Sequence, residues 1–137
     1  MEQLVVDSNI IVSSFLESEN FHERAQKYIN GLENGAYTFH LPMLVPVEVM
    51  SAISRRARQN RQALVAIWRQ NLIDWEHDGK IILYPLDQER MQNSITVAEQ
   101  NRLRGADSVI AALAEELDVS VKTFDQEILA RFLKASP

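Results

Sequence analysis

Short aliphatic runs alternate along this chain with longer segments whose apolar residues recur at helical spacing. The aliphatic runs predict strands at 4–7, 37–41, 81–85 and 119–124. The longer segments predict helices just after Asp7, at about 20–33, from Pro46, at 61–75, at 88–101, around Asp107 and at 125–133. Parallel strands need long crossover connections, usually helices, so this alternation predicts a parallel sheet. We therefore expect an α/β fold with a short central parallel sheet, of about four to five strands, and helices on both faces.

The length and composition fit one folded domain. A chain of 137 residues, 46% of them hydrophobic, is long enough to bury a core. No linker or low-complexity segment divides it, so we expect a single domain over 1–137. The core face expected for the helix at 61–75 consists of Leu64, Ile67, Trp68, Leu72 and Trp75.

Several classes of protein are excluded by what the chain lacks. It has no cysteine, which rules out disulfides, thiolate zinc sites and a cysteine nucleophile, and which suits a reducing cytoplasm. The N-terminus lacks the basic and apolar regions of a signal peptide, and no apolar stretch is long enough for a membrane helix. We therefore expect a cytoplasmic protein that does not enter the membrane.

Four carboxylates stand where a strand or loop passes into a helix: Asp7, Glu48, Asp107 and Asp125. Each lies inside or beside an apolar run, where an unpaired ionised carboxylate is costly. Asp7 and Asp125 follow predicted strands, and ligands of parallel α/β sheets bind beyond the carboxyl ends of the strands. Each aspartate alone could equally be a helix cap. Glu48, inside VPVEVMSAI, is harder to explain as a structural residue.

A bound divalent cation would explain why these acids converge. Mg²⁺ and Mn²⁺ prefer hard oxygen ligands and leave coordination positions for a substrate phosphate. Such ions support phosphodiester cleavage, whereas the same cluster without metal would repel itself and raise its own pKa values. We therefore predict Mg²⁺ or Mn²⁺ as the cofactor.

The charges suggest where phosphates would bind. The net charge of −5 argues against a protein that coats nucleic acid electrostatically. Arginines nevertheless gather in two places, with Arg55 and Arg58 following Glu48 and with Arg102 and Arg104 preceding Asp107. Because guanidinium groups bind phosphates through two hydrogen bonds, these four are candidate contacts to a phosphate backbone, although a solvated helix face is the ordinary role of each.

Other chemistries find less support. His22, His40 and His77 are scattered, and the four glycines form no phosphate-binding loop, so zinc and nucleotide sites are not expected. A haloacid-dehalogenase-like phosphatase would need an Asp where Asn9 stands. A phosphoacceptor receiver domain would need an acid at the end of strand 81–85, and Asp87 lies beyond Pro85. A non-catalytic RNA- or protein-binding module remains an alternative, with the acids structural.

The residues also resemble a known family over nearly the whole chain. Val-Val-Asp-Ser-Asn-Ile at 5–10, a Glu after Pro46, Gly-Ala-Asp with an Ala-rich helix at 105–114, and Thr-Phe-Asp at 123–125 occur in the order typical of PIN-domain ribonucleases. In size and layout the chain looks like their VapC-like members, the toxins of toxin–antitoxin pairs. The resemblance implies a three-layer α/β/α PIN-like fold and metal-dependent cleavage of RNA.

The resemblance also implies roles for particular residues and partners. The family's metal-binding acids correspond to Asp7, Glu48, Asp107 and Asp125, and accompanying polar positions correspond to Asn9 and Thr123. A further acid that some members carry beyond Asp125 is missing, and Glu127 is a poor substitute. A small antitoxin protein and a homodimer are the implied partners, and the apolar region 44–75 could hold a partner helix.

Overall fold

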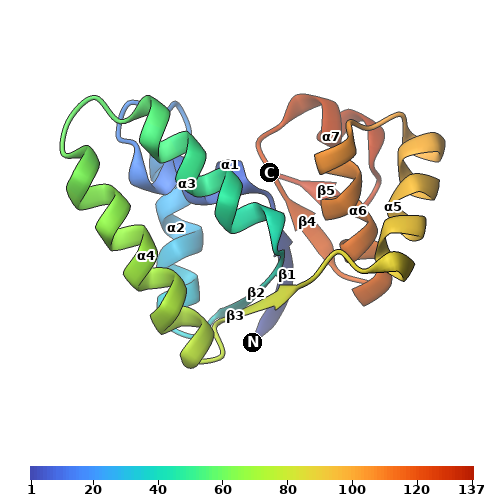
Figure 1. The fold of residues 1–137 in the computed structure, drawn as a ribbon, viewed down its shortest axis with the longest axis horizontal. Coiled ribbons are helices and arrows are strands. Elements are labelled where there is room, and N and C mark those ends of the chain that lie inside the picture. Colours follow the sequence, from blue (N-terminus) through green and yellow to red (C-terminus); the bar gives the residue numbers. More distant parts are fainter.

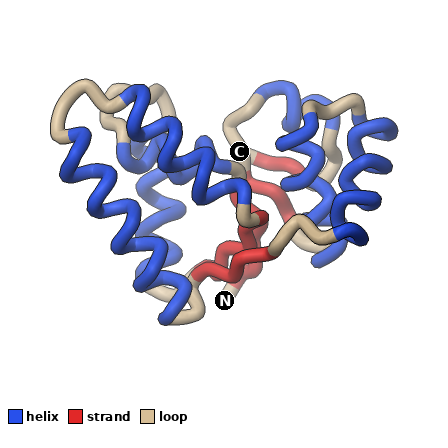
Figure 2. The backbone as a smooth tube through the Cα atoms, viewed as in Figure 1, coloured by secondary structure: helices blue, strands red, loops and turns tan.

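The structure is a computed structural model that describes residues 1–137. Its five strands are β1 (Glu2–Val6), β2 (Tyr37–Pro42), β3 (Ile81–Tyr84), β4 (Ser120–Lys122) and β5 (Ala135–Ser136). Its seven helices are α1 (Ser8–Phe15), α2 (His22–Glu33), α3 (Leu44–Arg56), α4 (Arg61–His77), α5 (Gln88–Asn101), α6 (Gly105–Leu117) and α7 (Gln126–Arg131). Helices, strands and connections are distinguished in Figure 2. The predicted α/β fold is confirmed.

The five strands form one parallel sheet in the order β3-β2-β1-β4-β5. From β1 the chain adds β2 and β3 on one side and later adds β4 and β5 on the other. The order therefore reverses between β1 and β4, whose residues Leu4 and Val6 pair with Ser120 and Lys122. This reversal is the place where ligands of open parallel sheets bind, outside the carboxyl ends of the strands.

Helices cover both faces of the sheet. Helices α1 to α4 lie on one side of the strands and α5 to α7 on the other (Figure 1). Helix α6 contacts β1, β2 and β4, whereas α2 and α3 contact β2 and α4 contacts β3. This three-layer arrangement places the first turns of α1, α6 and α7 at the carboxyl edge of the sheet.

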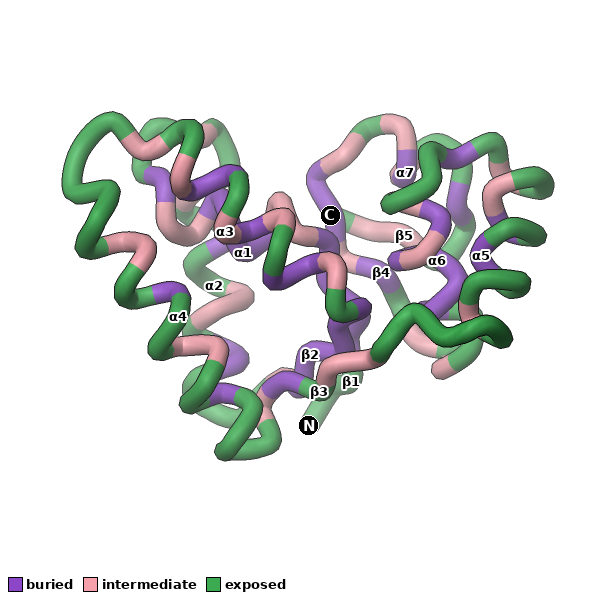
Figure 3. Tube along the Cα trace, viewed as in Figure 1, coloured by how far each residue is buried: buried purple, intermediate pink, exposed green.

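The core is built around the central strand. Leu4, Val5 and Val6 of β1 are fully buried and belong to a cluster of 29 buried residues. Successive side chains of a strand point to opposite faces, so three consecutive buried residues require cover on both faces. Figure 3 shows this burial concentrated on the strands and on the inward sides of the helices. The rigid centre of the fold is therefore the strand that ends at Asp7.

Three details differ from the sequence prediction. Strand β5 was not predicted, because it has only two residues and no β-branched side chain. Ile67, expected in the core, is 48% exposed, because α4 packs through the narrow stripe of Trp68 and Trp75. Helix α3 ends at Arg56, so Arg58 lies beyond the helix that carries Glu48.

No helix in the structure is both long enough and apolar enough to span a bilayer.

Candidate active site

Asp7 occupies the centre of the carboxyl edge. It follows β1, precedes α1 and is only 5% exposed, and its backbone N–H continues the ladder by donating to the Lys122 carbonyl at 2.9 Å. Its side chain makes no capping hydrogen bond. Instead, the Thr123 hydroxyl donates to Asp7 Oδ2 at 2.7 Å. Burial raises the pKa of Asp7, although the hydrogen bond from Thr123 opposes this. The shortest side-chain hydrogen bond of the carboxylate is therefore to Thr123, beyond β4, and the Ser8 hydroxyl of α1 donates to it at 3.4 Å.

Thr123 joins the two strand ends at the switch point. Its hydroxyl, which is fully buried, accepts from Asn9 Nδ2 at 3.3 Å and from the Asp125 backbone N–H at 3.0 Å, besides donating to Asp7. Asn9 Oδ1 accepts in turn from the Phe124 backbone N–H at 3.2 Å. The β1–α1 joint and the β4–α7 joint are thus held together by side chains on both.

Glu48 points toward the same place from α3. Its Oε1 is buried and has no hydrogen-bond partner. Burial raises its pKa, and the charges of Asp7 and Asp107 raise it further. A buried carboxylate oxygen without a donor costs free energy. The most direct compensation is a cation or an ordered water.

Asp107 lies in the first turn of α6 and is half-buried. Burial and the charges of Asp7 and Asp125 raise its pKa to about 6, although Arg104 acts in the opposite direction. The charge coupling of Asp107 to Asp7 and Asp125, and of Glu48 to Asp7 and Asp107, means that the four carboxylates share one electrostatic site.

Asp125 has two roles. Its Oδ1 accepts from the backbone N–H groups of Glu127 at 2.8 Å and Ile128 at 3.2 Å, so the side chain caps α7. The second oxygen is free of these bonds. Among the three aspartates for which a cap was an alternative, the structure therefore gives a capping hydrogen bond only to Asp125; Asp7 makes none, and the cap position of α6 is Arg104.

The donor set fits a hard divalent cation. Four carboxylates supply oxygen ligands, one buried oxygen has no partner, and three of the groups have raised pKa values because their charges are desolvated and repel one another. No three of these side chains lie close enough together in the structure to form a complete ligand set. Mg²⁺ commonly retains several water ligands, so it does not require a closed protein cage.

The predicted arginines divide by position. Arg55 lines a cleft of about 370 Å³ together with Ser8, Asn9 and Glu48, and so does Arg56, which the sequence prediction missed. Arg56 also pairs with Glu19 at 2.9 Å. The signal for Arg55 and Arg56 was their spacing, since residues seven or eight positions after Glu48 lie on its face of α3.

The second arginine pair borders the opposite side of the site. Arg104 pairs with Glu127 at 3.5 Å, and Glu127 also pairs with Arg131. Glu127 raises the pKa of Asp107 through its charge, so this acid stands at the margin of the site. Arg102 ends α5 in a left-handed conformation, and its carbonyl accepts from Arg131.

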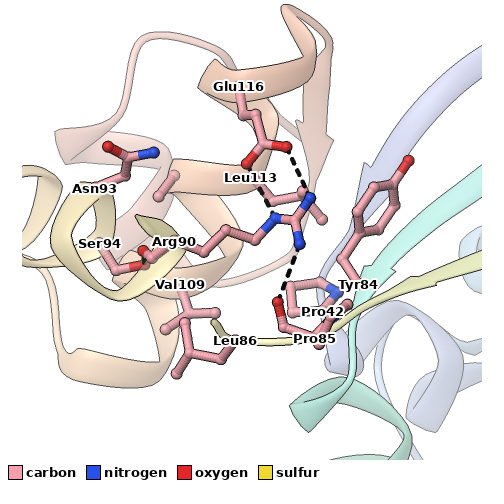
Figure 4. Close-up of a pocket in the computed structure, with 11 residues that line it drawn as sticks. Pro42, Tyr84, Pro85, Leu86, Arg90, Asn93, Ser94, Val109, Leu113 and Glu116 are labelled. Carbon is pink, nitrogen blue, oxygen red and sulfur yellow. Dashed lines mark hydrogen bonds and ion pairs between the residues drawn. The ribbon is translucent and has the colours of Figure 1, made fainter. Parts of the chain in front are cut away.

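A separate pocket, lined by none of the four acids, carries a satisfied polar cluster (Figure 4). There Arg90 donates with two nitrogens to Glu116, both at 3.1 Å, and lies 5.1 Å from the centre of the Tyr84 ring. Its cavity of about 10 Å³ has room for roughly one water. This cluster therefore fastens α5 to α6 and β3 and offers no ligand site.

Comparisons with known proteins agree with this arrangement. The PIN domain family profile matches residues 4–132. The fold is similar to a toxin–antitoxin complex from Klebsiella pneumoniae, with 15% identity, a TM-score of 0.70, and coverage of 98% of this chain and 96% of that one. It is similar to FitAcB from Neisseria gonorrhoeae, with 17% identity, a TM-score of 0.69, and coverage of 98% and 96%.

A third similar structure is VapC20 from Mycobacterium tuberculosis, a toxin that cleaves the sarcin-ricin loop. Here the identity is 12%, the TM-score is 0.68, and the coverage is 98% of this chain and 99% of that one. No curated protein matches the chain. Because the family profile spans nearly the full length, the chain belongs to the PIN domain family.

Proposed function

We propose that this protein is a Mg²⁺- or Mn²⁺-dependent ribonuclease that hydrolyses RNA phosphodiester bonds, acting in the cytoplasm as the toxin of a toxin–antitoxin pair. The observation that carries the proposal is the shared carboxylate site of Asp7, Glu48, Asp107 and Asp125 at the switch point between β1 and β4. Membership of the PIN domain family and the likeness to toxin structures support it.

The four carboxylates would hold the cation. When bound, a divalent ion supplies positive charge against the phosphate oxygens and acidifies water for attack on phosphorus. The protein's own residues set the position of the ligands. Thr123 holds Oδ2 of Asp7 and the cap of α7 holds Oδ1 of Asp125, while Oδ1 of Asp7 accepts only a long 3.4 Å hydrogen bond from the Ser8 hydroxyl. Such support from neighbouring groups orients ligands and tunes their basicity.

The substrate backbone would bind beside the acids. Arg55 makes no ion pair in the structure and lines the cleft that contains Glu48, which suits a bidentate contact to a phosphate. Arg104 flanks Asp107 and is mostly exposed, with its Glu127 partner at 3.5 Å. Arg58 and Arg102 remain weaker candidates, because Arg58 lies outside α3 and Arg102 ends α5.

An antitoxin would bind along α3 and α4. A groove of about 440 Å³ runs between these helices and is lined by Pro46, Val47, Met50, Trp68 and Leu72. Val47 is 69% exposed, which leaves apolar surface for an amphipathic segment of a partner. A homodimer belongs to the same proposal, and exposed apolar side chains such as Met43 and Leu86 are candidates for its interface.

Cleavage of a mixed RNA pool tests the activity. We expect the purified protein to cut RNA with Mg²⁺ or Mn²⁺ and not with EDTA, and Asp7→Asn to lower the rate by at least about a hundredfold because it removes a ligand charge. Asp87→Asn is the matched control, since Asp87 caps α5 away from the site and asparagine also caps helices.

Three outcomes would count against the proposal. Cleavage that persists in EDTA would reject the metal, and cleavage unaffected by Asp7→Asn would place the chemistry elsewhere. Absence of cleavage together with absence of metal-induced stabilisation would favour a non-catalytic binding module.

A further inference from the structure

Helix α2 and the residue before it carry aromatic and cationic side chains on a surface that begins next to Phe124, between Thr123 and Asp125. We propose that this surface holds single-stranded RNA on one side of the scissile bond, an inference that rests on the proposed ribonuclease function. We call it the α2 track, formed by Phe21, Arg24, Lys27, Tyr28 and, from β2, Tyr37.

The track starts at a residue that packs against the β4–α7 joint of the site. Phe21 stacks on Phe124, with ring centres 4.6 Å apart and planes 23° apart. Phe124 stands between Thr123 and Asp125, and its backbone N–H donates to Asn9. Although Phe124 is buried, Phe21 is 40% exposed. An exposed flat ring at this point can stack with a base, and such stacking tolerates any sequence.

The track continues along α2 by helical spacing. Residues three and seven positions after Phe21 lie on the same side of a helix, and these are Arg24 and Tyr28. Arg24, Lys27, Tyr28 and Tyr37 line one cleft of about 210 Å³. Aromatic rings interspersed with cations are the composition of grooves that bind single strands.

The cations of the track are available. Arg24 and Lys27 are exposed and make no ion pair in the structure, in contrast to Arg56, Arg90, Arg104 and Arg131. The charged side chains that line the cleft of the track are Arg24 and Lys27, and no acidic side chain lines it. In a chain of net charge −5, this local excess favours a phosphate chain here.

The rings of Tyr28 and Tyr37 are held in place by their neighbours. The Tyr28 hydroxyl donates to the Pro137 carbonyl at 2.9 Å, and the rings of Tyr28 and Tyr37 are 5.9 Å apart. Gly31 leaves the space that the Tyr37 ring occupies, because a Cβ atom there would collide with the ring. A preorganised ring loses little conformational entropy when it binds a base.

Binding in EDTA separates this inference from catalysis. The probe is a fluorescent, mixed-sequence single-stranded RNA of about ten nucleotides, within the length range of one binding groove, and anisotropy gives Kd over a range of salt. We expect Arg24→Ala/Lys27→Ala to weaken binding and to reduce the salt slope by about 0.7 for each cation removed. The matched control Arg61→Ala/Arg69→Ala removes the same charge from α4 and should bind as the wild type does.

Substitution of Phe21 tests the stacking. Phe21→Leu keeps an apolar contact with Phe124 but loses the flat ring, and we expect about fivefold weaker binding or more, with little change in Tm. Phe21→Trp should restore affinity. In cleavage assays the track variants should raise KM and leave kcat nearly unchanged, since they remove binding common to substrate and transition state.

The results distinguish this inference from the proposed function. If the α2 and α4 double variants weaken binding equally, charge alone explains affinity and the track is wrong. If the wild type cleaves RNA and the α2 variants bind and cleave as it does, the track is wrong and the ribonuclease proposal stands. If the wild type neither binds nor cleaves RNA, both are wrong.

Discussion

The carboxylate of Asp107 is one whose negative charge the fold does not fully compensate. It lies in the first turn of α6, where the helix dipole favours a negative charge, and Arg104 also favours the ionised form. Burial and two neighbouring aspartates outweigh both effects and bring the pKa to about 6. The groups of the protein therefore do not stabilise the ionised form of Asp107 enough to keep its pKa at the ordinary value, and a bound cation would do so.

This pKa predicts how metal-free stability depends on pH. Because the folded value exceeds the ordinary value of 3.8, the folded state binds the proton more tightly, so the contribution of Asp107 to stability falls as pH rises from about 4 to about 6. Asp107→Asn should therefore gain stability relative to the wild type across this window. Urea unfolding in EDTA from pH 4 to 7 measures the difference.

An exposed residue of opposite behaviour supplies the control. The ion pair with Lys134 lowers the pKa of Asp118, so its contribution is present above the unfolded value and is lost as pH falls. Asp118→Asn should change the pH dependence in the other direction. A difference between wild type and Asp107→Asn that does not vary with pH would contradict the raised pKa.

At the scale of elements, the site depends on the junction of β4 with α7. Thr123 holds Asp7, Asn9 and the Asp125 backbone through one hydroxyl. Thr123→Val keeps the shape but leaves buried polar groups unpaired, and each such group costs about 1–3 kcal/mol. We expect lower stability in urea and, if the site is catalytic, cleavage reduced by about 10–100-fold, the range for groups that orient metal ligands.

The hydroxyl can be tested apart from the methyl group. Thr123→Ser keeps the donor and acceptor but leaves a small cavity, so it should retain most of the activity and lose some stability. If Thr123→Ser and Thr123→Val lose activity equally, packing rather than hydrogen bonding positions Asp7.

The joints between strands and helices were the part of the fold most open to prediction. Aliphatic runs that end in Asp located β1 and β4, and the parallel sheet followed from the alternation. The short strand β5 could not be predicted, because its two residues form a strand only by pairing with β4 in the folded sheet. The ion pairs of Arg56 with Glu19 and of Arg104 with Glu127 could not be predicted either, because each joins two segments that no local sequence pattern connects.

At the scale of the molecule, the site combines segments that lie far apart in the sequence. Its acids come from positions 7, 48, 107 and 125, and the reversal of strand order brings the ends of β1 and β4 together. The convergence of the acids could be expected from this topology. The stacking of Phe21 on Phe124 could not, because neither residue carries a pattern that refers to the other.

A ligand that binds a site assembled from four segments stabilises the entire fold. The unfolded chain separates the four acids, so Mg²⁺ or Mn²⁺ should bind the folded state preferentially and raise Tm. At an ion concentration of a hundred times Kd, the free energy of unfolding should rise by about 2.7 kcal/mol. NaCl at equal ionic strength should not produce this shift. Protons compete for the same carboxylates, so the shift should shrink as pH falls below the Asp107 value of about 6.

Differential scanning fluorimetry with each ion at pH 5 and pH 7.5 measures this shift. Glu48→Gln should reduce the metal-induced shift in Tm, because a neutral amide of similar shape replaces the carboxylate that carries the unpartnered oxygen. Metal-free Glu48→Gln should melt no lower than the wild type, since the repulsion by Asp7 and Asp107 disappears. A metal shift that is equal in wild type and Glu48→Gln, or independent of pH, would mean that the ion binds elsewhere on the molecule.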